Sequence, residues 1–184
     1  MKNLDQLFQS FENGMKSAVK PKQYLKEIGL DSDTLRIGYN SAQFHHSKPQ
    51  ELKDHYESIG ILKKNGTAIK QGETAYTVFG SRGLIFPLVD KENTTVNYFA
   101  YRFELSTPKE EYLNMAGLYP SYPAPKTKRL FITPMLMDAA TLIQSKALGK
   151  KETVLALHNG KLLPQHLEAI GKLKDLEEII MIKR

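Results

Sequence analysis

The chain has 184 residues, enough for one large domain or two small ones, and it has no cysteine, which excludes disulfides, cysteine-ligated zinc and a thiol nucleophile. No apolar run approaches the roughly 20 residues that span a bilayer, and residues 1–20 lack a signal-peptide core, so we expect a cytoplasmic protein without membrane contact. The net charge of +6 favours an anionic partner, above all nucleic acid, and most of the excess lies in residues 128–184, with 10 Lys and Arg against 6 Asp and Glu.

The first part of the chain is predicted to be helical. Apolar residues at helical spacing indicate an amphipathic helix over residues 3–18. Pro21 is typical of the start of a second helix, which Gly29 would end, and residues 49–59 predict a third.

Two short polar segments are predicted to be exposed turns. Adjacent histidines, as in residues 44–47, point to different faces of a helix or strand, so we interpret them as solvated turn residues rather than metal ligands. The run Lys-Lys-Asn-Gly at residues 63–66 has the composition of a turn.

Strands are predicted next, over residues 76–79, 84–89 and 96–103, the last two joined by a hairpin turn. Arg82 precedes one of these strands and Arg102 lies near the end of another, so the hairpin would bring their guanidinium groups near one face. Paired arginines suit phosphate because each offers a planar fork of donors. Alternatively, the two are surface residues at strand ends.

A proline-rich segment, residues 119–127, predicts a stiff and extended linker between residues 1–118 and residues 128–184. Its tyrosines lie beside basic side chains, which would also suit the bases and phosphates of a single strand. These basic residues are Lys126, Lys128 and Arg129.

The last part reads as a βαβαβ unit, with strands over residues 130–133, 153–157 and 179–182. The two intervening segments, residues 135–146 and 163–173, have helical spacing. We therefore predict an α+β N-terminal subdomain followed by an α/β domain with a short parallel sheet. Ligands and metals bind such sheets at the carboxyl ends of the strands.

Several motifs, in this order, resemble the catalytic core of bacterial-type DNA primases, in which a basic N-terminal subdomain precedes a Toprim domain. In the first subdomain these are Ile37-Gly38-Tyr39, the run from Arg82 to Asp90 with its central Phe-Pro, Tyr98 to Arg102, and Tyr112-Leu113-Asn114. In the Toprim part they are Leu130 to Asp138 and Ala156 to Leu167. The stretch from Gly117 to Pro123 is similar to primase-like proteins of mobile elements.

The resemblance fails where Toprim chemistry needs carboxylates to hold Mg²⁺. Pro134 stands in place of the first-strand glutamate, and Lys183-Arg184 replaces an Asp-x-Asp. Asp138 is the one carboxylate of the pattern that remains and is our only catalytic candidate. We predict no metal site and no cofactor, with Mg²⁺ relevant only if the chain is catalytic.

The resemblance implies a primase-like protein that binds single-stranded DNA or a DNA/RNA hybrid, in replication or mobile-element maintenance, with catalysis lost. The residues predicted to contact nucleic acid are Arg82, Arg102, Tyr112, Asn114, Lys126, Lys128 and Arg129. One alternative is an active Mg²⁺-dependent primase in which Asp138 acts with Glu104 or Asp90. Another is a non-catalytic module that binds a replicative helicase or other replication proteins.

Overall fold

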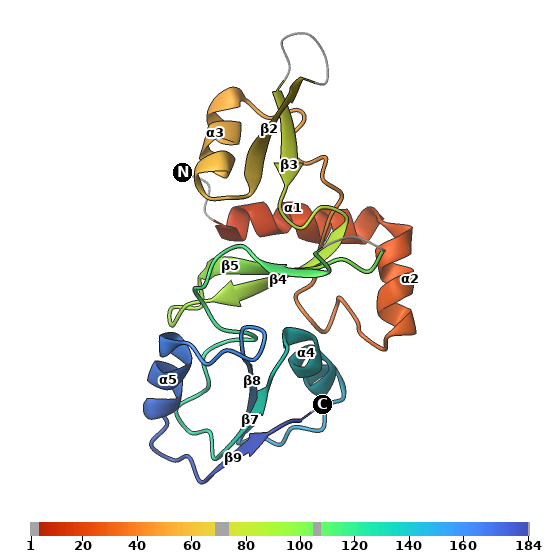
Figure 1. Ribbon diagram of the computed structural model, residues 1–184. Coiled ribbons are helices and arrows are strands. Elements are labelled where there is room, and N and C mark those ends of the chain that lie inside the picture. Colours follow the sequence, from red (N-terminus) through yellow and green to blue (C-terminus); the bar gives the residue numbers. More distant parts are fainter. Residues whose placement is uncertain (1–3, 69–73, 105–107, 184) are drawn as a thin grey trace.

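The computed structural model describes residues 4–68, 74–104 and 108–183 (Figure 1). The helices are α1 (Leu4–Ser17), α2 (Val19–Glu27), α3 (Gln50–Ser58), α4 (Leu136–Gln144) and α5 (Pro164–Gly171). The first strands are β1 (Gly38–Asn40), β2 (Leu62–Ala68), β3 (Thr74–Val78), β4 (Gly83–Val89) and β5 (Thr95–Tyr101). The remaining strands are β6 (Glu110–Tyr112), β7 (Arg129–Thr133), β8 (Glu152–Ala156) and β9 (Glu178–Met181).

An antiparallel sheet with the order β1-β4-β5-β6 occupies the middle of the molecule (Figure 1). Helix α1 packs on it so closely that a Cβ atom at Gly38 would lie 2.5 Å from Cβ of Phe11. All of β4 is buried, although it contains Pro87, which has no N–H for a sheet hydrogen bond. Pro87 lies beyond the three residues of β4 that pair with β1, so the missing donor leaves that ladder intact.

The β2–β3 hairpin and α3 form one end of the molecule (Figure 1). The predicted turn at residues 63–66 is wrong, because this segment lies within β2, where Lys63 and Lys64 pair with β3. The prediction of solvated histidines is wrong for His45, which is 7% exposed. Its ring lies between those of Phe44 and Tyr76, at centroid distances of 5.6 and 5.7 Å.

The other end of the molecule holds the parallel sheet, in the order β8-β7-β9. The predicted βαβαβ order and the parallel pairing are confirmed. Helix α4 packs on one face of the sheet, and the other is covered by Ala169 of α5 and by Leu173 just after it.

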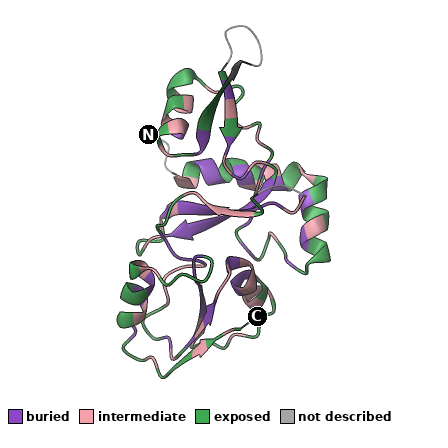
Figure 2. Cartoon of the chain, viewed as in Figure 1, coloured by how far each residue is buried: buried purple, intermediate pink, exposed green. Residues whose placement is uncertain are grey.

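The segment between the two sheets is packed against both parts of the chain. Tyr119 is 4% exposed and its carbonyl accepts a hydrogen bond from the amide of Ala156 at 3.0 Å. One core cluster contains Phe86 of β4 together with Ala139 and Ala140 of α4. Figure 2 shows this buried layer continuing from β4 and β5 into β7 and β8. Tyr119, the first residue of the proline-rich segment, therefore lies in a core that both parts of the chain share.

Candidate nucleic-acid interface

In the part of the chain that the structure describes, the carboxyl ends of the parallel strands carry no cluster of acids. Pro134 follows β7 and His158 lies two residues beyond β8. Asp138, in the first turn of α4, lines a cavity of about 240 Å³. The other lining residues are Thr133, Thr141, Leu142, Ser145 and Ile182. Mg²⁺ prefers several oxygen ligands, and within the described ranges no three His, Cys, Asp or Glu residues lie close enough to hold a metal. The residues present do not fit the Mg²⁺ site of a phosphoryl transferase.

The two acids considered as partners of Asp138 lie elsewhere. Asp90 is in the β4–β5 turn, where its carboxylate accepts the amides of Glu92 and Thr94 at 3.0 and 2.9 Å. Glu104 follows β5 at the opposite end of that hairpin and pairs with Lys20 at 3.4 Å. Neither acid lines the cavity of Asp138.

The β4–β5 hairpin brings Arg102 next to the turn that holds Arg82, but the two guanidinium groups differ in exposure. Arg102 is 8% exposed, and its guanidinium donates to the carbonyls of Ser81 (3.2 Å) and Pro108 (2.6 Å) and pairs with Glu111. Its donors are therefore directed to the protein. Arg82 is exposed at the turn, with φ of 55°, and its amide donates to the carbonyl of Asn40 at 2.7 Å.

Tyr112 and Asn114 hold the fold together. The Tyr112 ring stacks on His158 of the other part of the chain, with centroids 4.5 Å apart and an interplanar angle of 26°. Burial raises the pKa of Tyr112. Asn114 exchanges hydrogen bonds with Asn97, which is fully buried and was not predicted as a functional residue.

The three basic residues near the linker lie at the amino end of β7. They are therefore at the opposite edge of the sheet from the carboxyl ends of the strands. Lys128 pairs with Glu177, and Arg129 pairs with Glu152 and Glu178. Lys126 is exposed. Because the carboxyl ends of the strands meet the N-terminal part through Tyr119 and Tyr112, these cations do not border that junction.

Four aromatic side chains that are scattered in the sequence come together beside Arg82. The Tyr24 ring stacks on Phe103, with centroids 4.9 Å apart and an interplanar angle of 20°, and on Tyr101 at 6.1 Å. The hydroxyls of Tyr24 and Tyr101 are 3.1 Å apart, and Tyr39 lies 6.3 Å from Phe103. We call these four residues, Tyr24, Tyr39, Tyr101 and Phe103, the aromatic strip.

Exposed cations border the aromatic strip. The ammonium of Lys109 lies 5.3 Å from the centre of the Tyr101 ring. Burial and the charge of Glu104 raise the pKa of Tyr39, while the charges of Arg82 and Lys20 act in the opposite direction. Lys20, Arg82 and Lys109 therefore lie around a partly exposed row of rings. Sequence reasoning missed this site because α2, β1 and the end of β5 supply its members.

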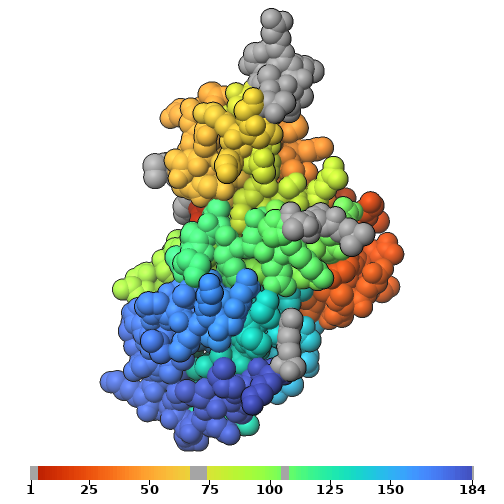
Figure 3. All heavy atoms as spheres, in the orientation of Figure 1, coloured from red at the N-terminus to blue at the C-terminus, as the bar shows by residue number. Residues whose placement is uncertain are grey.

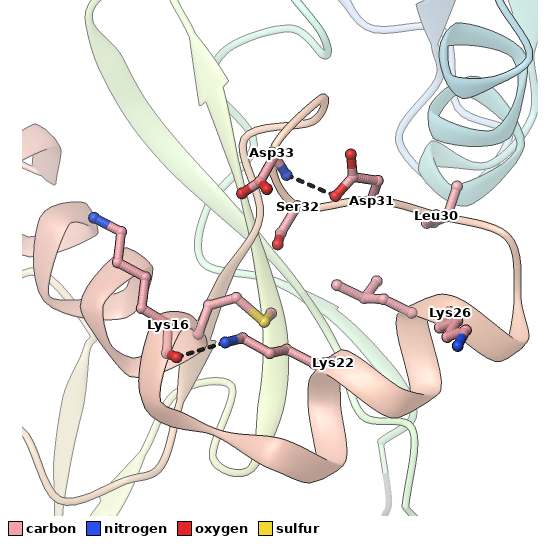
Figure 4. Close-up of a pocket in the computed structure, with 9 residues that line it drawn as sticks. Lys16, Lys22, Lys26, Leu30, Asp31, Ser32 and Asp33 are labelled. Atoms are coloured by element: carbon pink, nitrogen blue, oxygen red, sulfur yellow. Dashed lines mark hydrogen bonds between the residues drawn. The ribbon is translucent and has the colours of Figure 1, made fainter.

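A larger cavity, of about 460 Å³, is lined by residues of α1, α2 and the following turn (Figure 4). Its charged groups have local partners. The ammonium of Lys22 donates to the carbonyl of Lys16 at 2.6 Å, and the carboxylate of Asp31 accepts the amide of Asp33 at 3.0 Å. Because both lysines and aspartates line it, the cavity favours neither an anion nor a cation.

No family model and no curated protein sequence matches the chain. Solved structures do match. The DnaG primase catalytic domain bound to ssDNA has a TM-score of 0.76 at 17% identity, over 96% of this chain and 58% of that chain. The E. coli primase catalytic core gives 0.76 at 19% identity, over 96% and 59%.

A third match is the RNA polymerase domain of the Mycobacterium tuberculosis primase DnaG in complex with double-stranded DNA. It gives a TM-score of 0.72 at 15% identity, over 96% of this chain and 61% of that chain. The protein therefore has a fold similar to that of the DnaG primase catalytic cores, and it spans about three fifths of the length of those chains. Among the described residues, no helix is long and apolar enough to cross a membrane.

Proposed function

We propose that this protein is a primase-like, single-stranded nucleic-acid-binding protein that lacks phosphoryl-transfer activity of its own. The observation that carries the proposal is the fold, which is similar to primase catalytic cores that include one bound to ssDNA. The sequence motifs support a Toprim-like C-terminal domain, and they suggest a role in DNA replication or in mobile-element maintenance in the cytoplasm.

The aromatic strip is the binding surface that we favour. Aromatic rings beside cations bind single strands because bases stack on the rings and phosphates meet the positive charges. Tyr24, Tyr39 and Phe103 are partly exposed, and Lys20, Arg82 and Lys109 are exposed beside them. In this proposal, a single strand of DNA, or the unpaired part of a DNA/RNA hybrid, lies along the strip.

Two of the predicted contacts have another role in this proposal. Arg102 is held by Glu111 and two carbonyls, so it positions the turn that presents Arg82 and does not contact phosphate itself. Tyr112 is stacked on His158 and helps to fix the junction between the two parts of the chain.

The proposed loss of catalysis follows from charge at the carboxyl ends of the strands. Phosphoryl transfer in this fold would need several carboxylates that hold metal ions near one another. Asp138 is the only carboxylate among the described residues that line the cavity there, and Lys183 lies just after β9. A single acid is a poor site for Mg²⁺, which prefers several oxygen ligands.

Binding of a labelled oligo(dT) measured by fluorescence anisotropy across salt concentrations tests the proposal. Each phosphate neutralised on a single strand contributes about −0.7 to the slope of log K against log salt, so three cations predict a slope of about −2. Mg²⁺ should lower the affinity only through competition for the phosphates. Absence of binding at low salt would contradict the proposal.

A matched pair of variants locates the site. Arg82→Gly removes the guanidinium at a position whose φ of 55° glycine adopts without strain, and it should weaken binding and flatten the salt slope by about 0.7. Lys174→Ala removes one positive charge from an exposed residue beyond α5 and should change neither quantity. Equal effects of the two substitutions would mean that net charge, rather than the aromatic strip, attracts the strand.

A further inference from the structure

Strand β9 forms an open edge of the parallel sheet. Its amides at Glu178 and Ile182 donate to the carbonyls of Lys128 and Ile132 at 3.1 and 2.9 Å, so the even-numbered residues of this strand bond to β7. The backbone groups of Ile179 and Met181 consequently point to the other side. Within the described part of the chain, no strand pairs with that side of β9.

The side chains of β9 on the α5 face are unusually exposed for a sheet. Ile179 pairs in register with Leu130, and Met181 with Ile132. The two β7 residues are 0% and 4% exposed, whereas Ile179 and Met181 are 46% and 54% exposed. Helix α5 thus covers β7 but not β9. In Figure 3 the end of the chain, coloured dark blue, lies at the surface of the lower part of the molecule.

The exposed face of this segment is self-complementary. The alternating exposed residues are Glu177, Ile179, Met181 and Lys183, in the order acid, apolar, apolar, base. If two such strands run antiparallel about a two-fold axis at Ile180, Ile179 lies opposite Met181 of the second copy. Glu177, whose carboxylate also pairs with Lys128 of its own chain, then lies opposite Lys183 of the second copy, and the reverse pair forms as well. In this register the outward-facing amides and carbonyls of Ile179 and Met181 bond to those of the second copy.

We propose that β9 pairs with β9 of a second copy of this chain, joining the two parallel sheets into one continuous sheet. A free strand edge with apolar side chains is a site of edge-to-edge association unless proline, a bulge or inward-pointing charge protects it. Residues 178–182 contain no proline and form regular pairs with β7. The charges at the two ends favour the antiparallel orientation. Only in that orientation does Glu177 of each copy lie opposite Lys183 of the other.

Sedimentation equilibrium of the 184-residue protein across a wide concentration range tests this proposal. We expect a reversible monomer–dimer equilibrium. The single substitutions Glu177→Lys and Lys183→Glu each place like charges opposite one another and should each weaken the dimer. Mixing the two variant proteins should restore association, because both cross-strand pairs then join opposite charges. A wild-type chain that stays monomeric, or a dimer that neither substitution weakens, would overturn the proposal.

A disulfide experiment tests the register itself. The chain has no cysteine, so Ile180→Cys introduces a single thiol at the two-fold axis. Residue 180 would face its own copy in a non-hydrogen-bonded antiparallel pair, where Cα atoms lie about 4.5 Å apart, within the range of a disulfide. Mild oxidation should therefore link two chains. Lys172→Cys on the exposed end of α5 is the control and should remain unlinked; equal linking of both variants would reject the register.

Discussion

Arg102 and Glu111 form an ion pair that joins the end of β5 to β6, and the same carboxylate accepts the amide of Gly80 at 2.7 Å. A single acid thus binds both a buried guanidinium and the turn that leads to Arg82. Because the guanidinium of Arg102 is held by this carboxylate, Arg102 is not available to contact a ligand. It also means that changes at Arg102 act first on the stability of the fold.

Arg102→Met keeps most of the aliphatic stem but removes the charge. The carboxylate of Glu111 then loses its partner in a partly buried position, and we expect the free energy of unfolding to fall by about 2–3 kcal/mol. Urea unfolding followed by circular dichroism measures this. A change below about 0.5 kcal/mol, the size typical of a surface substitution, would show that the pair adds nothing.

Two substitutions at Tyr24 separate the contributions of its ring and its hydroxyl to the binding of a single strand. Tyr24→Phe removes the hydrogen bond to Tyr101 but leaves the stacking surface, so the affinity for oligo(dT) should stay within about twofold of wild type. Tyr24→Leu removes the ring and should cost about 1–2 kcal/mol of binding free energy. Anisotropy titrations at one salt concentration compare the two. Equal loss in both variants would assign the effect to the hydroxyl.

His158 makes stability depend on pH. Burial and, to a smaller extent, the charge of the neighbouring His166 lower its pKa from 6.5 to about 4. The unfolded chain therefore takes up this proton at a higher pH than the folded chain. Stability contributed by the neutral ring is complete above about pH 6.5 and declines as the pH falls towards 4.

The variant His158→Phe tests the origin of that decline. Phenylalanine keeps the stack on Tyr112 and cannot be protonated, so unfolding free energies measured between pH 7 and 4.5 should fall less steeply than in wild type. His45, whose pKa burial also lowers to about 4, retains its own contribution. An unchanged slope would mean that His158 is protonated equally in both states.

A substitution at Asp138 tests the proposed absence of catalysis. Asp138→Asn should leave the affinity for oligo(dT) unchanged, with and without Mg²⁺, because this residue lies away from the aromatic strip. Neither protein should incorporate labelled nucleotides on a primed or unprimed template. Mg²⁺-dependent incorporation by the wild type that the substitution abolishes would instead identify an active primase.

The sequence predicted those elements whose signal is local. Leu4, Leu7, Phe8 and Phe11 have helical spacing, and the last three of them lie on the buried face of α1. The alternation of short apolar runs with helical segments likewise predicted the parallel sheet. In both cases the pattern can be read from residues that are close together in the sequence.

The errors concern contacts between residues distant in the sequence. Lys63 and Lys64 have turn-like neighbours, yet pairing with Thr77 and Tyr76 makes them part of a strand. His45 is buried by an aromatic ring that lies 31 residues away in the sequence, that of Tyr76. No periodic pattern reports such pairings, because the partners meet only after the chain has folded.

The same limit applies to the candidate site. Arg82 was found because a motif surrounds it, whereas its companions Tyr24 and Phe103 stack on each other across 79 positions of the chain. The partner that occupies the guanidinium of Arg102 could not be predicted from the residues beside it in the sequence.

The core cluster that joins Phe86 to Ala139 and Ala140 also decides how the protein unfolds. Neither part of the chain can lose its structure without exposing apolar surface of the other, so heat should melt both in one cooperative transition. Calorimetric and van't Hoff enthalpies should then agree for the whole chain. A protease that cuts at Pro123 should produce two fragments that stay associated until the shared core melts.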